Sequence, residues 1–122
     1  GLINLLVGDI EYTLGVRHKY KNESSLNTTN SQRNFINDYG PCDIVCIAHK
    51  HYCEVQSTKR MGQEMIYMRS GTYKYYDEFG QKLAGYEGML GVPCVILFNN
   101  EKLMIPFNDI KKGILTYKNL IK

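Results

Sequence analysis

The sequence has no long apolar run. Its longest apolar stretches, residues 5–7 and 92–98, are far shorter than the roughly 20 residues that a membrane-spanning helix needs. The start of the chain also lacks the basic segment followed by an apolar segment that is typical of a secretory signal. We therefore expect no membrane segment, a cytoplasmic location and four reduced cysteines.

Strong charge and internal repetition are also absent. The formal net charge is +3, which is compatible with an anionic partner but too small to indicate a dedicated nucleic-acid surface. The hydrophobic and charged fractions, 43% and 22%, are those of an ordinary globular domain, and no repeat is visible. A chain of 122 residues is expected to form a single domain, residues 1–122, with a real core.

The first part of the chain predicts a β-hairpin. Residues 3–7 and 12–17 are rich in β-prone side chains and are separated around a Gly-Asp pair. Side chains alternate between the two faces of a strand, so the even-numbered residues of the second strand share one face, and His18 ends that row. His18 is therefore expected to end a strand and to point where the core-facing residues point.

A helix and a buried strand are expected next. Thr29 and Gln32 have the spacing of a capping box, and Gly40 followed by Pro41 is typical of a helix end. The helix is expected to bury three apolar side chains, Phe35, Ile36 and Tyr39. Residues 43–48 form a nearly continuous apolar run, which is typical of a strand covered on both faces. Strand, helix and buried strand in this order predict a crossover between two parallel strands.

The remaining segments predict antiparallel pairs and a last helix. Residues 52–59 and 64–69 alternate well enough for a hairpin, and residues 94–98 and 102–107 flank an Asn-Asn pair that suits a tight turn. Asn108 is expected to cap the last helix. The apolar stripe of this helix is expected to comprise Ile110, Ile114, Tyr117 and Ile121. The sequence therefore predicts an α/β fold with a mixed sheet and flanking helices.

The chain contains three histidines, and each lies at or just beyond the end of a predicted strand. His49 and His51 follow the buried strand directly, and alternation in an extended segment places both side chains on the same side. Ligands tend to bind at the carboxyl ends of strands in α/β sheets, and a parallel neighbour would bring His18 to the same edge. This pattern fits a metal site of three imidazoles, but ordinary surface or core histidines explain it as well.

Several segments match the pattern of one enzyme family. Residues 42–52, with the sequence CDIVCIAHKHY, contain a motif similar to Gly-His-x-His, and residues 16–18, Val-Arg-His, contain a preceding histidine. Residues 68–73 are similar to a Gly-Ser segment, and residues 76–79 and 88–93 continue the likeness. Together these segments resemble the second half of calcineurin-like metallophosphoesterases, most closely the phage and bacterial members. The resemblance covers nearly the whole chain but only the second half of the family's domain.

The resemblance implies a metal-dependent phosphoester hydrolase. In it His18, His49 and His51 would bind two divalent transition-metal ions, for which imidazole makes Mn, Fe or Zn suitable. Two such ions would activate water for attack on a phosphomonoester or phosphodiester, and the phage-like segments favour a nucleic-acid or nucleotide substrate. Arg17 and Lys19, beside His18, are the candidate substrate-binding residues, although solvated surface charge explains them too.

Three motifs of the family are missing from the chain. The sequence contains no Asp-x-His, no Gly-Asp-x-x-Asp and no Gly-Asn-His-Asp/Glu, and Ala48 replaces the glycine of the last signature. Without the bridging carboxylate, the Asn ligand and the acid–base histidine, three imidazoles cannot complete a two-metal site. We therefore expect a polypeptide that begins further upstream, and either self-association or a missing amino-terminal half. A lone half would leave a sheet edge and an apolar face exposed.

Two other interpretations remain open. Five residues, Cys42, Cys46, His49, His51 and Cys53, supply thiol and imidazole groups for a structural zinc site. Their spacing, however, differs from the two separated ligand pairs of most such sites. The chain also fits a non-catalytic binding or interaction module derived from the same fold. An upstream segment that carries the missing motifs would favour the enzyme over the module.

Overall fold

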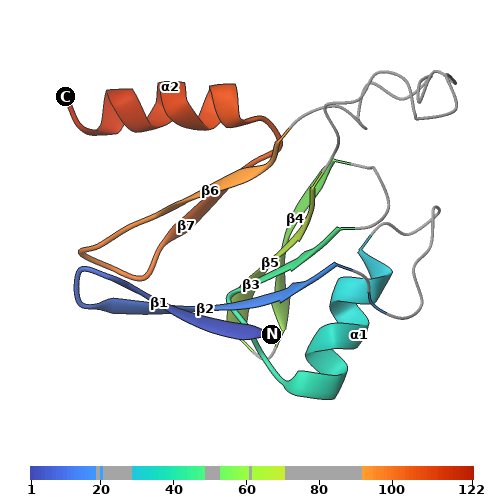
Figure 1. Ribbon diagram of the computed structural model, residues 1–122. Helices are drawn as coiled ribbons and strands as arrows, with labels where there is room; N and C mark the ends of the chain where they lie inside the picture. Colours follow the sequence, from blue (N-terminus) through green and yellow to red (C-terminus); the bar gives the residue numbers. More distant parts are fainter. Residues whose placement is uncertain (19, 21–28, 49–52, 61, 71–91) are drawn as a thin grey trace, which may run out of the picture.

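The computed structural model describes residues 1–18, 20, 29–48, 53–60, 62–70 and 92–122, and these form a mixed α/β fold (Figure 1). In chain order, the elements are β1 (Leu2–Val7), β2 (Ile10–Arg17), α1 (Asn30–Tyr39), β3 (Ile44–Ile47), β4 (Glu54–Arg60), β5 (Gln63–Arg69), β6 (Cys94–Leu97), β7 (Met104–Phe107) and α2 (Ile110–Leu120). Within these described ranges, neither helix is long and apolar enough to span a membrane.

Five strands form one mixed sheet in the order β1-β2-β3-β5-β4. The central pairings, β2 with β3 and β3 with β5, are parallel, whereas the outer pairings, β1 with β2 and β4 with β5, are antiparallel. The predicted parallel pairing across the helix is therefore confirmed. Strands β6 and β7 form a separate antiparallel pair, also as predicted.

Both hairpins of the five-stranded sheet turn at a glycine with positive φ. Gly8 has φ 62° and Gly62 has φ 78°, values that residues with a Cβ rarely adopt. At Gly8 the neighbouring backbone is also close, because a Cβ there would lie 2.9 Å from the carbonyl oxygen of Asn99. The β1–β2 turn therefore meets the turn between β6 and β7, as the left side of Figure 1 shows.

Helix α1 has the predicted ends but not the predicted capping box. It begins after Thr29 and ends before Gly40, yet the Thr29 side chain makes no capping hydrogen bond. Thr29 Oγ1 instead donates to Gln56 Oε1 in β4 (2.9 Å), and Gln32 Nε2 donates to the carbonyl oxygen of Met68 in β5 (2.8 Å). The capping prediction is wrong because tertiary hydrogen bonds use both side chains.

Helix α1 covers one face of the five-stranded sheet. Phe35 and Ile36 are buried as predicted, in a cluster with residues of β3 and β5. Tyr39 is 53% exposed, so the prediction that it is buried is wrong. Its ring packs against Phe35 at the rim of the cluster, with 4.8 Å between centroids. Gly15 allows the close contact of α1 with β2, because a Cβ there would lie 2.4 Å from Phe35 Cε1.

The β6–β7 hairpin covers part of the opposite face. Met104 packs in a second cluster with Tyr12 and Ile66. The Tyr12 hydroxyl donates to the carbonyl oxygen of Phe98 (2.7 Å) and accepts from the amide of Leu103 (3.2 Å). A buried hydroxyl that is fully paired avoids the cost of burial, so these bonds attach the hairpin firmly to β2.

Helix α2 contacts β6 and β7 but leaves its apolar stripe in solvent. Its N-cap is Asp109 rather than Asn108, because the Asp109 carboxylate accepts from the amide of Lys111 (3.0 Å). The helix approaches β6 at Gly113, where a Cβ would lie 2.3 Å from Cys94 Sγ. The predicted stripe is exposed by 38 to 63% along its whole length, at Ile110, Ile114, Tyr117 and Ile121. Gly113 makes the close contact with β6, while Tyr117 and Ile121 of the stripe border an open pocket beside β6.

Candidate functional site

The carboxyl ends of the parallel strands meet at one edge of the sheet (Figure 1). Strand β2 ends at Arg17, which pairs with the last residue of β3. The amide of Ala48 then donates to the carbonyl oxygen of Arg17 (3.2 Å), which extends the pairing by one residue. The chain therefore leaves β2 and β3 from adjacent positions, Arg17 and Ala48.

His18 lies at the surface directly after β2. Tyr12 is buried on the same face of the strand, whereas Val16 is already 38% exposed. This face therefore leaves the core before the strand ends, and His18 at its end is exposed. An exposed imidazole at the end of a strand is accessible to a ligand.

Arg17 is exposed and contacts an aromatic side chain. Its Cζ lies 5.6 Å from the centroid of the Tyr20 ring, and the Tyr20 hydroxyl donates to the Asp38 carboxylate. This hydrogen bond raises the pKa of Tyr20 to about 12. Neighbouring residues of a strand point to opposite faces, so Arg17 lies on the α1 side and His18 on the other. Arg17 can therefore reach a ligand at this edge only from the helix side.

Three of the predicted site residues, Lys19, His49 and His51, lie outside the described residues. The strand pairing brings His18 beside the point where the His49–His51 segment begins, but the relative placement of the three imidazoles is not given. In the part of the chain that the structure describes, no group of three or more His, Cys, Asp or Glu side chains is arranged to hold a metal ion. The metal centre stays a prediction.

A buried arginine that no sequence pattern marks organises this edge. Arg69 is 1% exposed; its Nη1 donates to the carbonyl oxygen of Ala48 (2.5 Å) and its Nη2 to Ser31 Oγ (2.9 Å). A guanidinium is buried at high cost unless its donors are paired, and here one side chain joins β5, the end of β3 and the first turn of α1. Ala48 directly precedes His49, so Arg69 fixes the backbone from which that segment starts.

The charge of Arg69 affects the pKa of Cys46 in the neighbouring strand β3. Burial raises the pKa of the Cys46 thiol in β3, and the positive charge of Arg69 opposes part of that rise. The thiol stays protonated near neutral pH and behaves as a small apolar side chain. Two of the three parallel strands end in an arginine, Arg17 and Arg69, which favours an anionic ligand at this edge.

The cysteines are not arranged for a structural zinc site. Cys42 belongs to the apolar cluster on the α1 face, whereas Cys46 packs against the cluster on the opposite face. Cys53 donates to the carbonyl oxygen of Asn108 (3.0 Å). Burial raises the pKa of all three thiols, although metal ligation needs the thiolate. Cys42 and Cys46 are therefore not placed to bind one ion.

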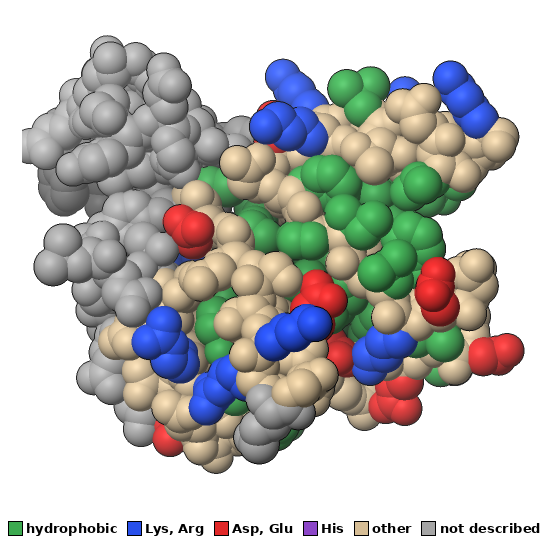
Figure 2. Space-filling view, turned by 180° about the vertical axis from the view of Figure 1, so that it is seen from behind, with side chains coloured by type: hydrophobic (Ala, Val, Ile, Leu, Met, Phe, Trp, Pro, Cys, Tyr) green, Lys and Arg blue, Asp and Glu red, His purple; other side chains and the backbone are tan. Residues whose placement is uncertain are grey.

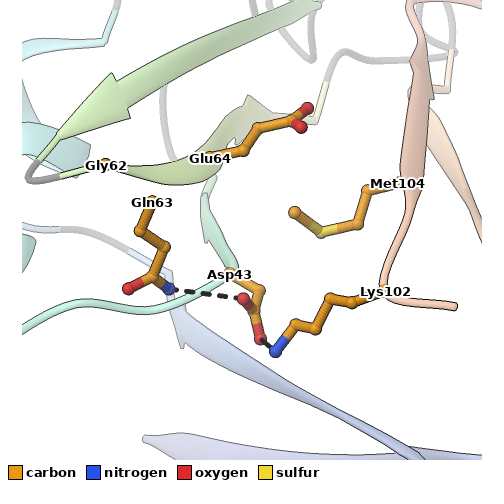
Figure 3. A pocket seen from close by; sticks show the side chains of 6 residues that line it. All are labelled: Asp43, Gly62, Gln63, Glu64, Lys102 and Met104. Carbon is orange, nitrogen blue, oxygen red and sulfur yellow. Dashed lines mark hydrogen bonds and ion pairs between the residues drawn. The ribbon is translucent and has the colours of Figure 1, made fainter.

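A pocket of about 430 Å³ lies at the other end of β3 (Figure 3). It is lined by Asp43, Gly62, Gln63, Glu64, Lys102 and Met104. The Asp43 carboxylate is buried; it accepts from the amide of Thr13 (2.7 Å) and from Gln63 Nε2 (3.4 Å), and it lies 3.0 Å from Lys102 Nζ. Its two oxygens bind groups from β2, β5 and the β6–β7 hairpin and so hold these elements together. We interpret this pocket as a structural junction.

The edge at the ends of β2, β3 and β5 is therefore the better candidate site. It combines the exposed imidazole of His18, the guanidinium of Arg17 and a backbone carbonyl held by Arg69. Comparison of the chain with models of known protein families, with curated proteins and with solved structures gave no match.

Proposed function

We propose that this chain is the carboxyl-terminal part of a calcineurin-like metallophosphoesterase, a metal-dependent hydrolase of phosphomonoesters or phosphodiesters. The pairing of β2 with β3 carries this proposal, because the bond from the Ala48 amide to the Arg17 carbonyl sets His18 beside the start of the His49–His51 segment. A mixed sheet with a helix on one face and a two-stranded sheet on the other supports the family's two-sheet sandwich as the finer description of the fold.

The residues of this edge take distinct roles in the proposal. His18, His49 and His51 hold two divalent transition-metal ions, and imidazole nitrogen suits Mn, Fe or Zn better than Mg or Ca. When bound, the ions supply Lewis-acid activation for attack on phosphorus. Arg17 and Lys19 bind the phosphate of the substrate, and Arg69 holds the Ala48 carbonyl so that the segment after it begins from a fixed point.

The chain by itself is proposed to bind metal without completing the reaction. The motifs that supply the remaining ligands and the acid–base group are not in its sequence, so the catalytic residues come from an amino-terminal half or another chain. We favour a nucleic-acid or nucleotide substrate. The four cysteines are free thiols, which supports a cytoplasmic location.

The proposal is tested by titration calorimetry with Mn²⁺ and with Zn²⁺. The full chain is compared with a His49→Ala/His51→Ala double variant and with His18→Ala. Asp9→Ala is the control, because Asp9 is an exposed potential ligand in the β1–β2 turn, at the far end of β2 from His18. We expect binding in the unaltered chain and in Asp9→Ala, and loss of binding in both histidine variants.

Two outcomes contradict this expectation. Binding that survives both histidine variants places the metal elsewhere, and absence of binding in the unaltered chain leaves the histidines without an independent metal-binding role. Either result favours the second candidate, a non-catalytic interaction module of the same fold, for which the exposed apolar strand β1 is the supporting observation.

A further inference from the structure

The outer strand β1 is an apolar sheet edge that is open to solvent. Five of its six residues are exposed, and Leu2 and Leu6 are 59% and 74% exposed. Its side chains are all apolar apart from that of Asn4. Sheet edges are normally protected by charge, by proline or by a bulge, and β1 has no charged residue, no proline and an unbroken register with β2. Such an edge is suited to pairing.

The hydrogen-bond pattern shows which groups of β1 face outward. Gly1 and Val16 exchange both backbone bonds, at 2.7 and 2.9 Å. Bonded and non-bonded pairs alternate in an antiparallel ladder, so Ile3, Leu5 and Val7 also bond to β2. The backbone N–H and C=O groups of the even-numbered residues, Leu2, Asn4 and Leu6, therefore point away from the sheet. These groups form a ready template for another strand.

Both faces of β1 are apolar. Ile3 and Leu5 pair with Leu14 and Tyr12, so they lie on the face that carries the β6–β7 hairpin. Beside them, Val7 borders a pocket of about 390 Å³ with apolar residues of β6 and α2, and Figure 2 shows apolar side chains gathered in this hollow beneath α2. Leu2 and Leu6 lie on the opposite face. A strand that is apolar on both faces fits the interior of a sheet better than its edge.

The charges of the β1–β2 hairpin indicate what pairs with this edge. The turn end carries Asp9 and Glu11, whereas the other end carries Arg17, and all three are exposed. A second copy that pairs antiparallel about a two-fold axis sets the acidic end of each hairpin beside the basic end of the other. Parallel pairing would instead set like charges together. The hairpin is therefore complementary to itself in one orientation only.

We propose that β1 pairs antiparallel with β1 of a second copy of this chain and joins the two five-stranded sheets into one. The outward groups place the two-fold axis at Asn4, so Asn4 pairs with Asn4 of the other copy and Leu2 with Leu6. On the other face, Ile3 lies opposite Leu5 in the closer, non-bonded pairs. The interface is isologous, forms without the metal site and does not depend on the proposed function.

The oligomeric state of the full chain tests the pairing. Sedimentation velocity between about 1 and 100 μM should show a reversible shift from the 14.1 kDa monomer to the dimer. Leu6→Lys should raise the dissociation constant at least roughly thirtyfold, because each copy then sets a charge into an apolar strand pair. Ser57→Lys, the matched change at an exposed position of the other edge strand β4, should leave it unchanged. Circular dichroism confirms that both variants are folded. A chain that stays monomeric throughout, or equal effects of the two lysines, overturns the proposal.

Cross-linking tests the register. Paired residues in a bonded position have Cα atoms about 5.5 Å apart, within disulfide range, so Asn4→Cys should oxidise to a covalent dimer in high yield. Leu6→Cys should not exceed the background of the unaltered chain, because Leu6 faces Leu2 and not itself. A dimer that forms equally from both variants, or from neither, contradicts antiparallel pairing centred on Asn4. In that case, any association of the chain occurs through another surface, such as the apolar stripe of α2.

Charge reversal tests the orientation. Glu11→Lys and Arg17→Glu should each weaken the dimer by about fivefold at low ionic strength, since the two charges lie roughly 16 Å apart, across three strand spacings and two residues along the strand, and are partly screened. The double variant should recover the original affinity. Additive weakening in the double variant contradicts the proposed juxtaposition of the two ends.

Discussion

The two edges of the five-stranded sheet differ in charge and in attachment. Strand β4 carries Glu54, Lys59 and Arg60 along seven residues, whereas β1 has no charged residue along six. Charged side chains discourage a second strand from adding to an edge, and an apolar edge invites it. Strand β4 therefore carries the usual protection of an edge strand, and β1 lacks it.

The same difference extends into the body of the fold. On the β4 side, α1 is tied by side-chain hydrogen bonds, from Thr29 to Gln56 and from Arg60 to Asn37. On the β1 side, α1 packs on β2 through the close contact of Phe35 with Gly15. Side-chain hydrogen bonds from Thr29, Arg60 and Arg69 therefore tie α1 to the β4 side, called the polar side below. On the other side, apolar packing at Gly15 is joined by the hydrogen bond from Tyr20 to Asp38. Substitutions on the two sides should therefore have unequal effects.

The largest effect is expected at Arg69, on the polar side. Arg69→Leu should lower the free energy of unfolding by about 3 kcal/mol, because it leaves the partly buried Ala48 carbonyl and the buried Ser31 hydroxyl without their donor. Urea unfolding followed by circular dichroism measures the change. Arg60→Leu is the control, since Arg60 makes one exposed hydrogen bond to Asn37, and it should cost less than about 1 kcal/mol. Equal losses in the two variants would contradict a special role for the buried guanidinium.

A smaller effect is expected at Asp43, midway between the two edges. Asp43→Asn should cost about 2 kcal/mol, because a neutral amide cannot accept from Thr13 and Gln63 and also pair with Lys102. Lys102→Met should cost less, since half of the Lys102 side chain is exposed and the pair is partly screened. Urea denaturation of both variants gives the ranking. The reverse ranking would show that the lysine, not the carboxylate, holds the junction.

Much of the fold is visible in the sequence because its signals are local. A few neighbouring residues are enough to predict each of three features: the turn at Gly8, the helix end at Gly40 and the buried strand β3. The order of strand, helix and strand then sets β2 parallel to β3. Because the pairing follows from that order, the edge beside His18 can be expected from the sequence alone.

The remaining features depend on contacts that are distant in sequence. Thr29 and Gln32 look like a local cap, but partners in β4 and β5 use their side chains. Arg69 ends a strand, where an arginine is usually exposed, and its burial is explained only by contacts with Ala48 and Ser31, which lie far away along the chain. The apolar residues of α2 do repeat with a helical period, but this repeat does not indicate whether the core or a partner covers the stripe.

The exposed edge should contribute little to the stability of the isolated monomer. Leu6→Ala should change the free energy of unfolding by less than about 0.5 kcal/mol in dilute solution, because a side chain that is 74% exposed buries little area on folding. Ile66→Ala in the inner strand β5, where the side chain is fully buried, should cost about 3 kcal/mol. Unfolding is measured at a concentration where sedimentation shows only monomer. A large loss in Leu6→Ala under those conditions would mean that β1 already packs within one copy.

The smallest expected effect is a pH dependence of stability that arises from the contact between α1 and the end of β2. On the β2 side, Tyr20 donates to Asp38, which raises its folded pKa to about 12 above an unfolded value near 10. The folded state then binds the proton more tightly, so this contribution is complete below about pH 10 and is lost as the pH rises towards 12. The urea midpoint of the unaltered chain should therefore fall towards that of Tyr20→Phe between about pH 10 and 12, because the phenylalanine variant lacks the bond at every pH. A difference between the two proteins that stays constant with pH would show that the Tyr20 hydroxyl does not hold the end of β2 against α1.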